Sequence, residues 1–159
     1  MSGSNNPLAW KTARKRNQAS KPLRDLLGLD LIKGEVMDYG CGRGTDTRVL
    51  KLKKFKCDSF DPHWQPKIDK TKRYDTIICV FVLNVIESEH ERARVCRSIY
   101  SLLKPGGRAY VAVRRDLRKP DGYTSIGTWQ GTVDVPGADL MFEKKGQYAL
   151  FTFGKDRYL

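Results

Sequence analysis

Apolar residues recur along the chain in two patterns, which predict helices alternating with strands. A leucine stripe between 23 and 31 has helical spacing, and Ser20 precedes it as an N-cap with Pro22 in the first turn. Short apolar runs without this spacing predict strands, and the run at 73–83 is typical of a parallel strand buried on both faces. The leucines of the stripe are Leu23, Leu26, Leu27 and Leu31.

The order of these elements predicts an α/β fold. Two strands within 140–153, joined at Lys145-Gly146, predict a C-terminal antiparallel hairpin. The stretch between Asp61 and Tyr74 is too short for a helix and another strand, so one α/β unit is shortened after the second strand. We expect a doubly wound, mostly parallel sheet. Its other predicted strands are 35–40, 55–61, 73–83 and 108–114, and its predicted helices are 20–31, 45–54 and 88–104, the last ended by the Pro-Gly-Gly at 105–107.

The length of 159 residues fits one domain. We expect residues 1–9 to form a flexible tail and residues 10–159 a single domain. Its first part, 10–34, is a basic arm followed by a helix. The stretch before the hairpin, 115–139, is rich in glycine, threonine and aspartate and predicts mostly loop.

Charge points to a polyanionic partner. The chain has a formal net charge of +12, and nucleic acid is the commonest partner of such proteins. We expect DNA or RNA to contact the basic arm, with Lys11, Arg14 and Lys21 as substrate-binding candidates. The alternative is that the arm is a solvated tail and the charge is incidental.

Cysteine and histidine usage argues against a metal site. The four cysteines show no C-x-x-C spacing, and the chain has only two histidines. Buried reduced thiols are typical of a cytoplasmic protein, and no apolar run has the length of a membrane span. We therefore expect a cytoplasmic protein that binds neither metal nor membrane; its oligomeric state is not predicted.

Three glycines on alternate positions follow the predicted strand at 35–40, where a backbone turns sharply or approaches a ligand. No glycine precedes Lys-Ser or Lys-Thr, which excludes a Walker phosphate loop. A dinucleotide fingerprint needs a glycine at position 45, where the chain has Thr45. The fit to a nicotinamide or flavin site is therefore poor.

The pattern Asp38-x-Gly40-x-Gly42-x-Gly44 resembles the first motif of class I S-adenosylmethionine-dependent methyltransferases. The resemblance implies a Rossmann-like fold, S-adenosyl-L-methionine as cofactor, and a carboxylate at Asp38 that orients its ammonium group. Asp61, at the end of the next strand, is placed to accept hydrogen bonds from ribose hydroxyls. The cofactor-binding residues predicted in this way are Asp38, Gly40, Gly42, Gly44, Asp46, Asp61, Pro62, His63, Val80 and Phe81.

A second, closer resemblance covers about Lys11 to Arg115. The stretches "KTARKRNQASKPL", "DYGCGRGTDT", "DPHWQP" and "VLNVIESEHERARV" are similar to the group of DNA phosphorothioation-associated methyltransferases. This implies an enzyme acting on nucleic acid or a nucleic-acid component. An acceptor that is a small molecule or a protein, and a catalytically silent donor-binding protein that binds nucleic acid, are the alternatives.

Catalytic candidates follow the predicted central strand, where ligands bind in open α/β sheets. Asn84 is placed to hold an acceptor by hydrogen bonds, and Glu87 is a candidate base, although each side chain is equally suited to capping a turn or helix. Neither an Asn-Pro-Pro-Tyr signature nor a Pro-Cys pair is present, so neither standard mechanism of base methylation is supported. His63 and Trp64 are expected to cover the adenine by stacking, with a surface loop that exposes an aromatic as the alternative. Tyr123, Trp129 and Gln130 are substrate-binding candidates in the long loop, unless Trp129 packs under that loop.

Overall fold

A computed structural model describes residues 8–13 and 15–156. Its main sheet has six strands in the order β2-β1-β3-β4-β8-β7. The first four run parallel, and β8 and β7 form the antiparallel hairpin predicted at the C-terminal end. Their bounds are β1 Val36–Tyr39, β2 Cys57–Phe60, β3 Tyr74–Val80, β4 Leu103–Arg114, β7 Asp139–Lys144 and β8 Tyr148–Gly154.

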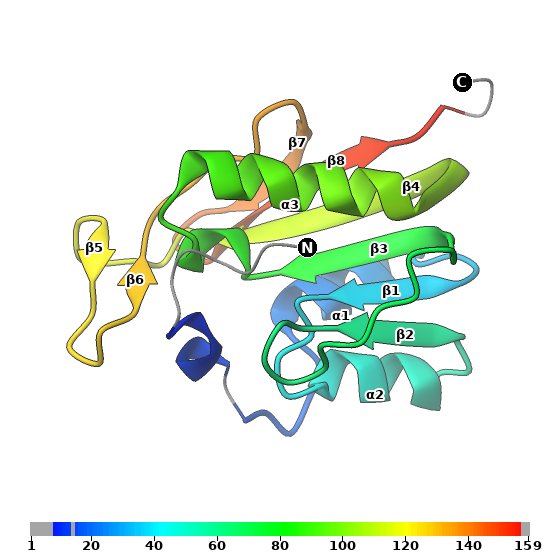
Figure 1. Ribbon diagram of the computed structural model, residues 1–159, viewed down its shortest axis with the longest axis horizontal. Coiled ribbons are helices and arrows are strands. Elements are labelled where there is room, and N and C mark those ends of the chain that lie inside the picture. The colour runs from blue at the N-terminus through cyan, green and yellow to red at the C-terminus, as the bar shows by residue number, and fades with distance from the viewer. Residues whose placement is uncertain (1–7, 14, 157–159) are drawn as a thin grey trace.

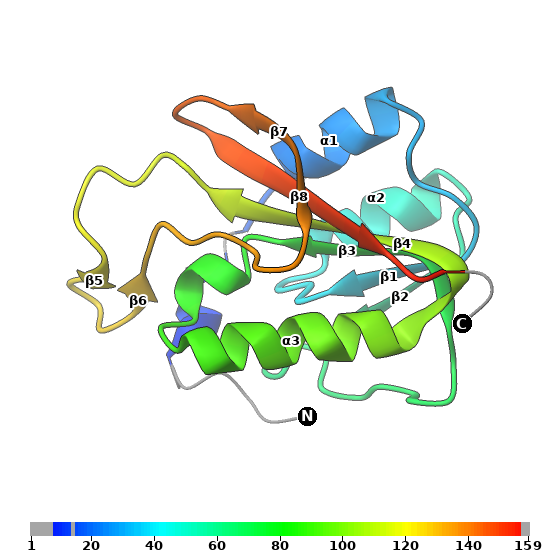
Figure 2. The same cartoon turned by 90° about the horizontal axis from the view of Figure 1, so that it is seen from above.

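Helices cover both faces of the sheet, as the predicted doubly wound fold requires. Figure 2 shows α1 (Lys21–Gly28) and α2 (Thr45–Leu52) on one face and α3 (Glu89–Leu102) on the other. The predicted N-cap is confirmed, because the Ser20 hydroxyl accepts a hydrogen bond from the Leu23 amide at 3.3 Å. Ser88 caps α3 in the same way.

The two faces carry separate hydrophobic clusters, with β3 between them. Ile77 and Cys79 of β3 pack with α3, whereas Ile78 packs with α1 and α2. Alternate side chains of a strand point to opposite faces, so β3 is buried on both, as predicted. All four cysteines are free thiols.

The predicted shortened unit is also confirmed. Between β2 and β3 the structure has only an isolated bridge from Asp61 to Gln65, without a helix or a further strand. As a result β2 forms one edge of the sheet.

The ends of β3 and α3 differ from the prediction. β3 ends at Val80 rather than near residue 83, because Phe81 adopts a φ of +59° that breaks the extended backbone, and a 3-10 helix, η2 (Leu83–Val85), follows. Likewise, α3 ends at Leu102, and 105–107 lie within β4 instead of closing the helix. A Cβ on Gly107 would lie 2.9 Å from the carbonyl oxygen of Tyr74, so this glycine permits close approach of β3.

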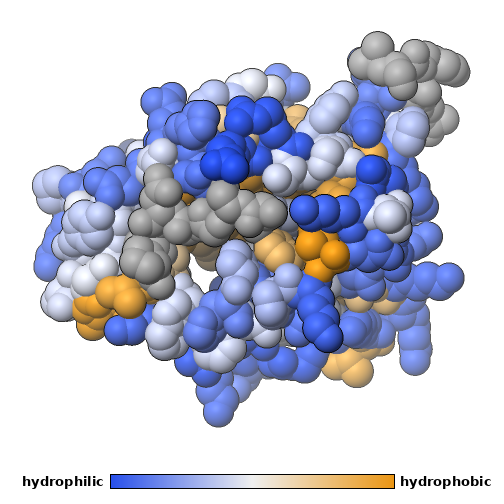
Figure 3. Space-filling view, in the orientation of Figure 1, coloured by the Kyte–Doolittle hydropathy of each residue, from blue (hydrophilic) through white to orange (hydrophobic). Residues whose placement is uncertain are grey.

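Two small elements lie beyond the carboxyl ends of the parallel strands. Figure 1 shows the 3-10 helix η1 (Ala9–Thr12) below and the small hairpin of β5 (Gly122–Tyr123) and β6 (Trp129–Gln130) to the side, both near the tips of the strand arrows. Ala9, which the prediction placed in the flexible tail, belongs to η1 and packs against the core. Figure 3 shows a mostly hydrophilic face with an apolar group over β5–β6, where Ile126 is exposed.

Among the described residues, no helix combines the length and the apolar composition that crossing a bilayer requires.

Candidate functional site

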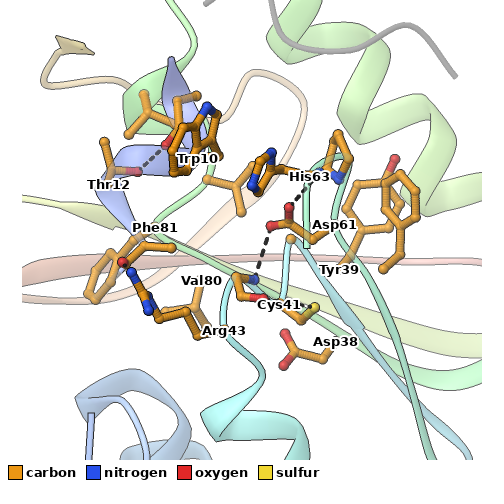
Figure 4. Close-up of a pocket in the computed structure, with 18 of the residues that line it drawn as sticks. Trp10, Thr12, Asp38, Tyr39, Cys41, Arg43, Asp61, His63, Val80 and Phe81 are labelled. Atoms are coloured by element: carbon orange, nitrogen blue, oxygen red, sulfur yellow. Dashed lines mark hydrogen bonds between the residues drawn. The ribbon is translucent and has the colours of Figure 1, made fainter. Parts of the chain in front are cut away.

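A cavity of about 370 Å³ lies where β1, β2 and β3 end. Its walls come from four separate stretches of chain within 9–16, 38–46, 60–63 and 80–86, together with Val95 of α3. The size falls in the usual range of small-molecule sites, and the carboxyl edge of an open parallel sheet is where such sites form. Figure 4 shows Trp10 and His63 on one side of this cavity and Asp38 on the opposite side.

The glycine segment makes the turn that opens the cavity. Gly40, Gly42 and Gly44 have φ values of +82°, +54° and +83°, a region that side chains disfavour. At Gly40 a Cβ would also lie 2.2 Å from the Val82 side chain. Gly40 and Gly42 line the cavity, whereas Gly44 is the N-cap residue of α2 and lies outside its lining.

Asp38, the penultimate residue of β1, is a buried carboxylate, 3% exposed, in the cavity wall. Its Oδ2 accepts a hydrogen bond from the Thr47 hydroxyl at 2.8 Å. Burial raises the pKa of Asp38 to about 7, and the nearby Asp46 carboxylate adds to the rise, while the Thr47 bond opposes it. A buried carboxylate of this kind is stabilised by a cation placed in the cavity.

Asp61 organises the loop that follows β2. Its Oδ2 accepts a hydrogen bond from the Gly42 amide at 3.0 Å, and its Oδ1 accepts from the amides of His63 and Trp64 at 2.9 and 3.0 Å. An ionised carboxylate offers about four acceptor positions, so room remains for a ligand hydroxyl. The neighbouring Pro62 and His63 line the cavity with it.

Asp46 connects the glycine segment to the N-terminal arm. Its carboxylate accepts hydrogen bonds from the backbone amide and the hydroxyl of Ser20 at 2.7 and 2.6 Å, and it lies 3.7 Å from the Arg16 guanidinium. Arg43 adds a bond from its Nε to the carbonyl oxygen of Ala13 at 3.2 Å. The side chains of Arg43 and Asp46 therefore hold the arm against the cavity.

Aromatic side chains cover the cavity from the arm. The Trp10 ring stacks on His63 with centroids 4.3 Å apart and planes 9° apart, and Trp64 packs edge-on against both. The Arg43 guanidinium lies over the Trp64 ring at 4.7 Å. Sequence reasoning missed Trp10, because neither its spacing nor its flanking residues distinguish it. Its place in the cavity wall becomes visible only through its contact with His63, which is distant in the sequence.

The two catalytic candidates belong to a different cluster. Asn84 is 1% exposed, lies outside the cavity lining, and donates from Nδ2 to Gln130 at 3.0 Å. Glu87 accepts a hydrogen bond from the exposed Tyr123 hydroxyl at 2.6 Å. These bonds attach β5–β6 to the η2 region. Trp129 is 7% exposed and packs in the core, which leaves its ring unavailable for stacking on a base.

The basic candidates are dispersed. The Lys11 ammonium lies 5.7 Å from the Trp10 ring centre and outside the cavity lining. Lys21 pairs with Asp25 at 2.8 Å on α1. Arg14 lies outside the described residues.

The remaining predicted cofactor residues, Val80 and Phe81, line the cavity at the end of β3. Sequence reasoning missed the residues that the arm and the β3–η2 segment contribute, because nothing local marks them. These residues are Ala9, Trp10, Thr12, Ala13, Arg16, Val82, Val85 and Ile86.

Several solved structures share the fold. The CcbJ methyltransferase from Streptomyces caelestis has a TM-score of 0.65 at 12% identity, covering 95% of this chain and 97% of that chain. The glycopeptide N-methyltransferase MtfA, complexed with S-adenosylmethionine, has a TM-score of 0.61 at 10% identity and coverages of 87% and 94%. The 1,6-didemethyltoxoflavin-N1-methyltransferase of Burkholderia thailandensis has a TM-score of 0.60 at 18% identity, covering 86% of this chain and 77% of that chain.

Sequence comparisons identify the family. A search of curated proteins finds no significant match. A model of the family described as "Methyltransferase domain", however, matches residues 10–148, which include the glycine segment and every residue that lines the cavity except Ala9. The chain therefore belongs to the methyltransferase domain family, with the Rossmann-like fold of the class I S-adenosylmethionine-dependent enzymes.

Proposed function

We propose that the cavity binds S-adenosylmethionine and that the chain transfers its methyl group to a nucleic acid or a nucleic-acid component. One observation carries the donor assignment. Two carboxylates, Asp38 on β1 and Asp61 directly after the neighbouring β2, and the Gly40 turn lie around one cavity of small-molecule size. Membership in the methyltransferase domain family supports the same donor.

The residues present fit the chemical groups of this donor. The buried carboxylate of Asp38 suits the ammonium of its methionine end, and Asp61 has an acceptor position left for a ribose hydroxyl. Gly40 allows the backbone to turn beside the cavity, with a φ of +82° and no room for a Cβ against Val82. The rings of Trp10 and His63 suit the adenine, since aromatic faces stack on bases.

When bound, S-adenosylmethionine would supply an activated methyl group, carried on its sulfonium sulfur, for transfer to a lone pair of the acceptor. The chain contributes position and surroundings. Asp38 fixes the charged end, and the Val80 and Phe81 side chains close the wall at β3. Trp10 and His63 cover the cavity against water. Glu87 lies outside the cavity lining and accepts a hydrogen bond from Tyr123, so proton transfer by Glu87 is not part of the proposed mechanism.

Charge supports the acceptor class. The net charge of +12 attracts polyanions, and the arm that borders the cavity is itself basic. The motif resemblance to the DNA phosphorothioation-associated group points the same way, and we propose membership in that group on those motifs alone.

A second candidate is a small-molecule acceptor. The cavity is bordered by arm and aromatic residues, and one similar structure is that of a 1,6-didemethyltoxoflavin-N1-methyltransferase. Methyl transfer from radiolabelled donor to DNA, to tRNA and to a metabolite pool separates the two candidates. Tight donor binding without a labelled product would instead favour a catalytically silent binding protein.

Replacing Asp61 tests the donor site. We expect Asp61→Ala to weaken binding of S-adenosylhomocysteine at least about tenfold in calorimetry, because hydrogen bonds to a charged group contribute about 1.5–3 kcal/mol. Asp58→Ala is the matched control: Asp58 lies on β2, the strand that leads into the Asp61 loop, outside the cavity lining, and pairs with Lys72 at 2.7 Å. Equal affinities in the two variants, or no binding to the unmodified chain, would contradict the proposal.

A further inference from the structure

A second hollow of about 540 Å³ adjoins the donor cavity. It is more open and is lined by residues 16–21, Arg24 and Phe81. Lys21 and Arg24 line this hollow and are not part of the proposed donor site. The hollow therefore requires an explanation of its own.

The two cavities share Arg16 and Phe81. Phe81 has a φ of +59°, a strained conformation for a bulky residue, and such strain is concentrated at functional sites. Its amide donates to the Ala112 carbonyl oxygen at 2.9 Å, and its ring packs edge-on against Tyr148. The backbone thus holds an aromatic ring at the junction of the two cavities.

The lining of the hollow is cationic. Arg16, Lys21 and Arg24 contribute positive charge, and no carboxylate is among the described residues that line it. Asp46 lies 3.7 Å from Arg16, and Asp25 pairs with Lys21 at 2.8 Å, so these two cations are partly neutralised from outside the lining. Arg24 is exposed and forms no ion pair within the described part of the chain.

Cations next to an aromatic ring suit a nucleotide. Guanidinium groups bind phosphate with paired N–H donors, and an aromatic face stacks on a base of any sequence. Asn17 and Gln18 add neutral hydrogen-bonding side chains to the same lining.

We propose that this hollow is the acceptor subsite: it binds a phosphate of a nucleotide unit through Arg16, Lys21 and Arg24 while Phe81 contacts the base beside the donor cavity. This assignment rests on the proposed methyl transfer. It narrows the class of acceptor to a phosphate-bearing nucleotide, either free or within a strand. Proximity to the donor, not a further chemical step, is what the subsite provides.

Calorimetry on the full chain tests the proposal in two stages. S-adenosylhomocysteine is titrated first, and its failure to bind would count against the donor site only. Cytidine 5′-monophosphate is then titrated into the protein, saturated with S-adenosylhomocysteine where that binds, with cytidine as the probe lacking phosphate. We expect cytidine to bind at least about tenfold more weakly, because it lacks the charge-assisted bonds.

Arg24→Gln should weaken binding of cytidine 5′-monophosphate about tenfold and leave that of S-adenosylhomocysteine unchanged. Arg97→Gln is the control, since it removes the same charge from an exposed position on α3, across the sheet. Equal affinity for nucleotide and nucleoside, or equal effects of the two variants, would overturn the proposal. A short single-stranded oligothymidylate distinguishes the two sources of phosphate: tighter binding than the mononucleotide identifies a strand, and weaker or equal binding identifies a free nucleotide.

Discussion

At the scale of single residues, Asp38 carries an unfavourable free energy of ionisation that a bound donor would reduce. Its carboxylate is buried beside Asp46, with Asp61 also near, and only Arg16 and the Thr47 hydroxyl oppose the resulting rise in pKa. Because the pKa of Asp38 is about 7, the proton is retained in the ligand-free chain as pH falls below neutral. An ammonium in the cavity would favour the ionised form.

A pH dependence of donor binding follows. Because the pKa of Asp38 is raised to about 7, a cationic ligand must displace a proton below that pH, and S-adenosylhomocysteine should bind more weakly by up to about tenfold per pH unit as pH falls from 7. Calorimetry between pH 8 and pH 5.5 measures this. Asp38→Asn should bind S-adenosylhomocysteine weakly at every pH and should lose the pH dependence. If this variant kept the pH profile of the unmodified chain, the pH dependence would belong to another group.

At the scale of elements, the arm and α2 act as one unit. Asp46 in the first turn of α2 binds the residue that caps α1, and the arm before that cap lines the cavity. The positions of these elements therefore depend on one buried carboxylate.

Asp46→Ala should lower both stability and donor affinity. It leaves the buried Ser20 amide without its partner, so we expect the free energy of unfolding to fall by about 1–3 kcal/mol. Chemical denaturation and calorimetry measure the two effects. Ser88→Ala removes the cap of α3, on the other face, and should cost about 1 kcal/mol without changing donor affinity. If Asp46→Ala lost stability alone, the arm would not help to form the donor site.

Sequence reasoning succeeded where structure is encoded locally. The Ser20 cap, the apolar run of β3 and the turn at Lys145-Gly146 each follow from neighbouring residues, and the glycine spacing placed Gly40 at the cavity. It failed for the arm, because Trp10 acquires its role only through His63 across the fold. Asn84 lies outside the cavity lining, where its bond to Gln130 depends on the path of a long loop, so its catalytic role stays a prediction.

At the scale of the whole molecule, Asp25 joins the two ends of the domain. It accepts hydrogen bonds from Tyr148 of the hairpin and from Lys21, and it pairs with Lys144 at 2.9 Å. Partial burial opposes ionisation, but these bonds prevail and lower the pKa of Asp25 to about 2. The cluster fixes α1 against β7–β8.

The sign of this shift gives a test of acid stability. Since the pKa of Asp25 falls from 3.8 to about 2 on folding, its contribution is complete above about pH 4 and is lost as pH falls toward 2. Asp25→Asn should therefore destabilise the chain at pH 6, with a smaller difference at pH 3, in urea denaturation. Asp30→Asn is the control, because Asp30 pairs with Lys33 on an exposed surface, where such pairs contribute little. Equal losses at pH 6 would contradict this account.

The shortened unit has a consequence for association of the protein with itself. A strand at the edge of a sheet offers unpaired backbone groups, and natural proteins discourage aggregation there with short strands and charged side chains. β2 has four residues, carries Asp58, and follows the exposed Lys53, Lys54 and Lys56. The sheet thus ends in a strand poorly suited to pair with another chain, and this small methyltransferase domain leaves out a unit without acquiring an aggregation-prone edge.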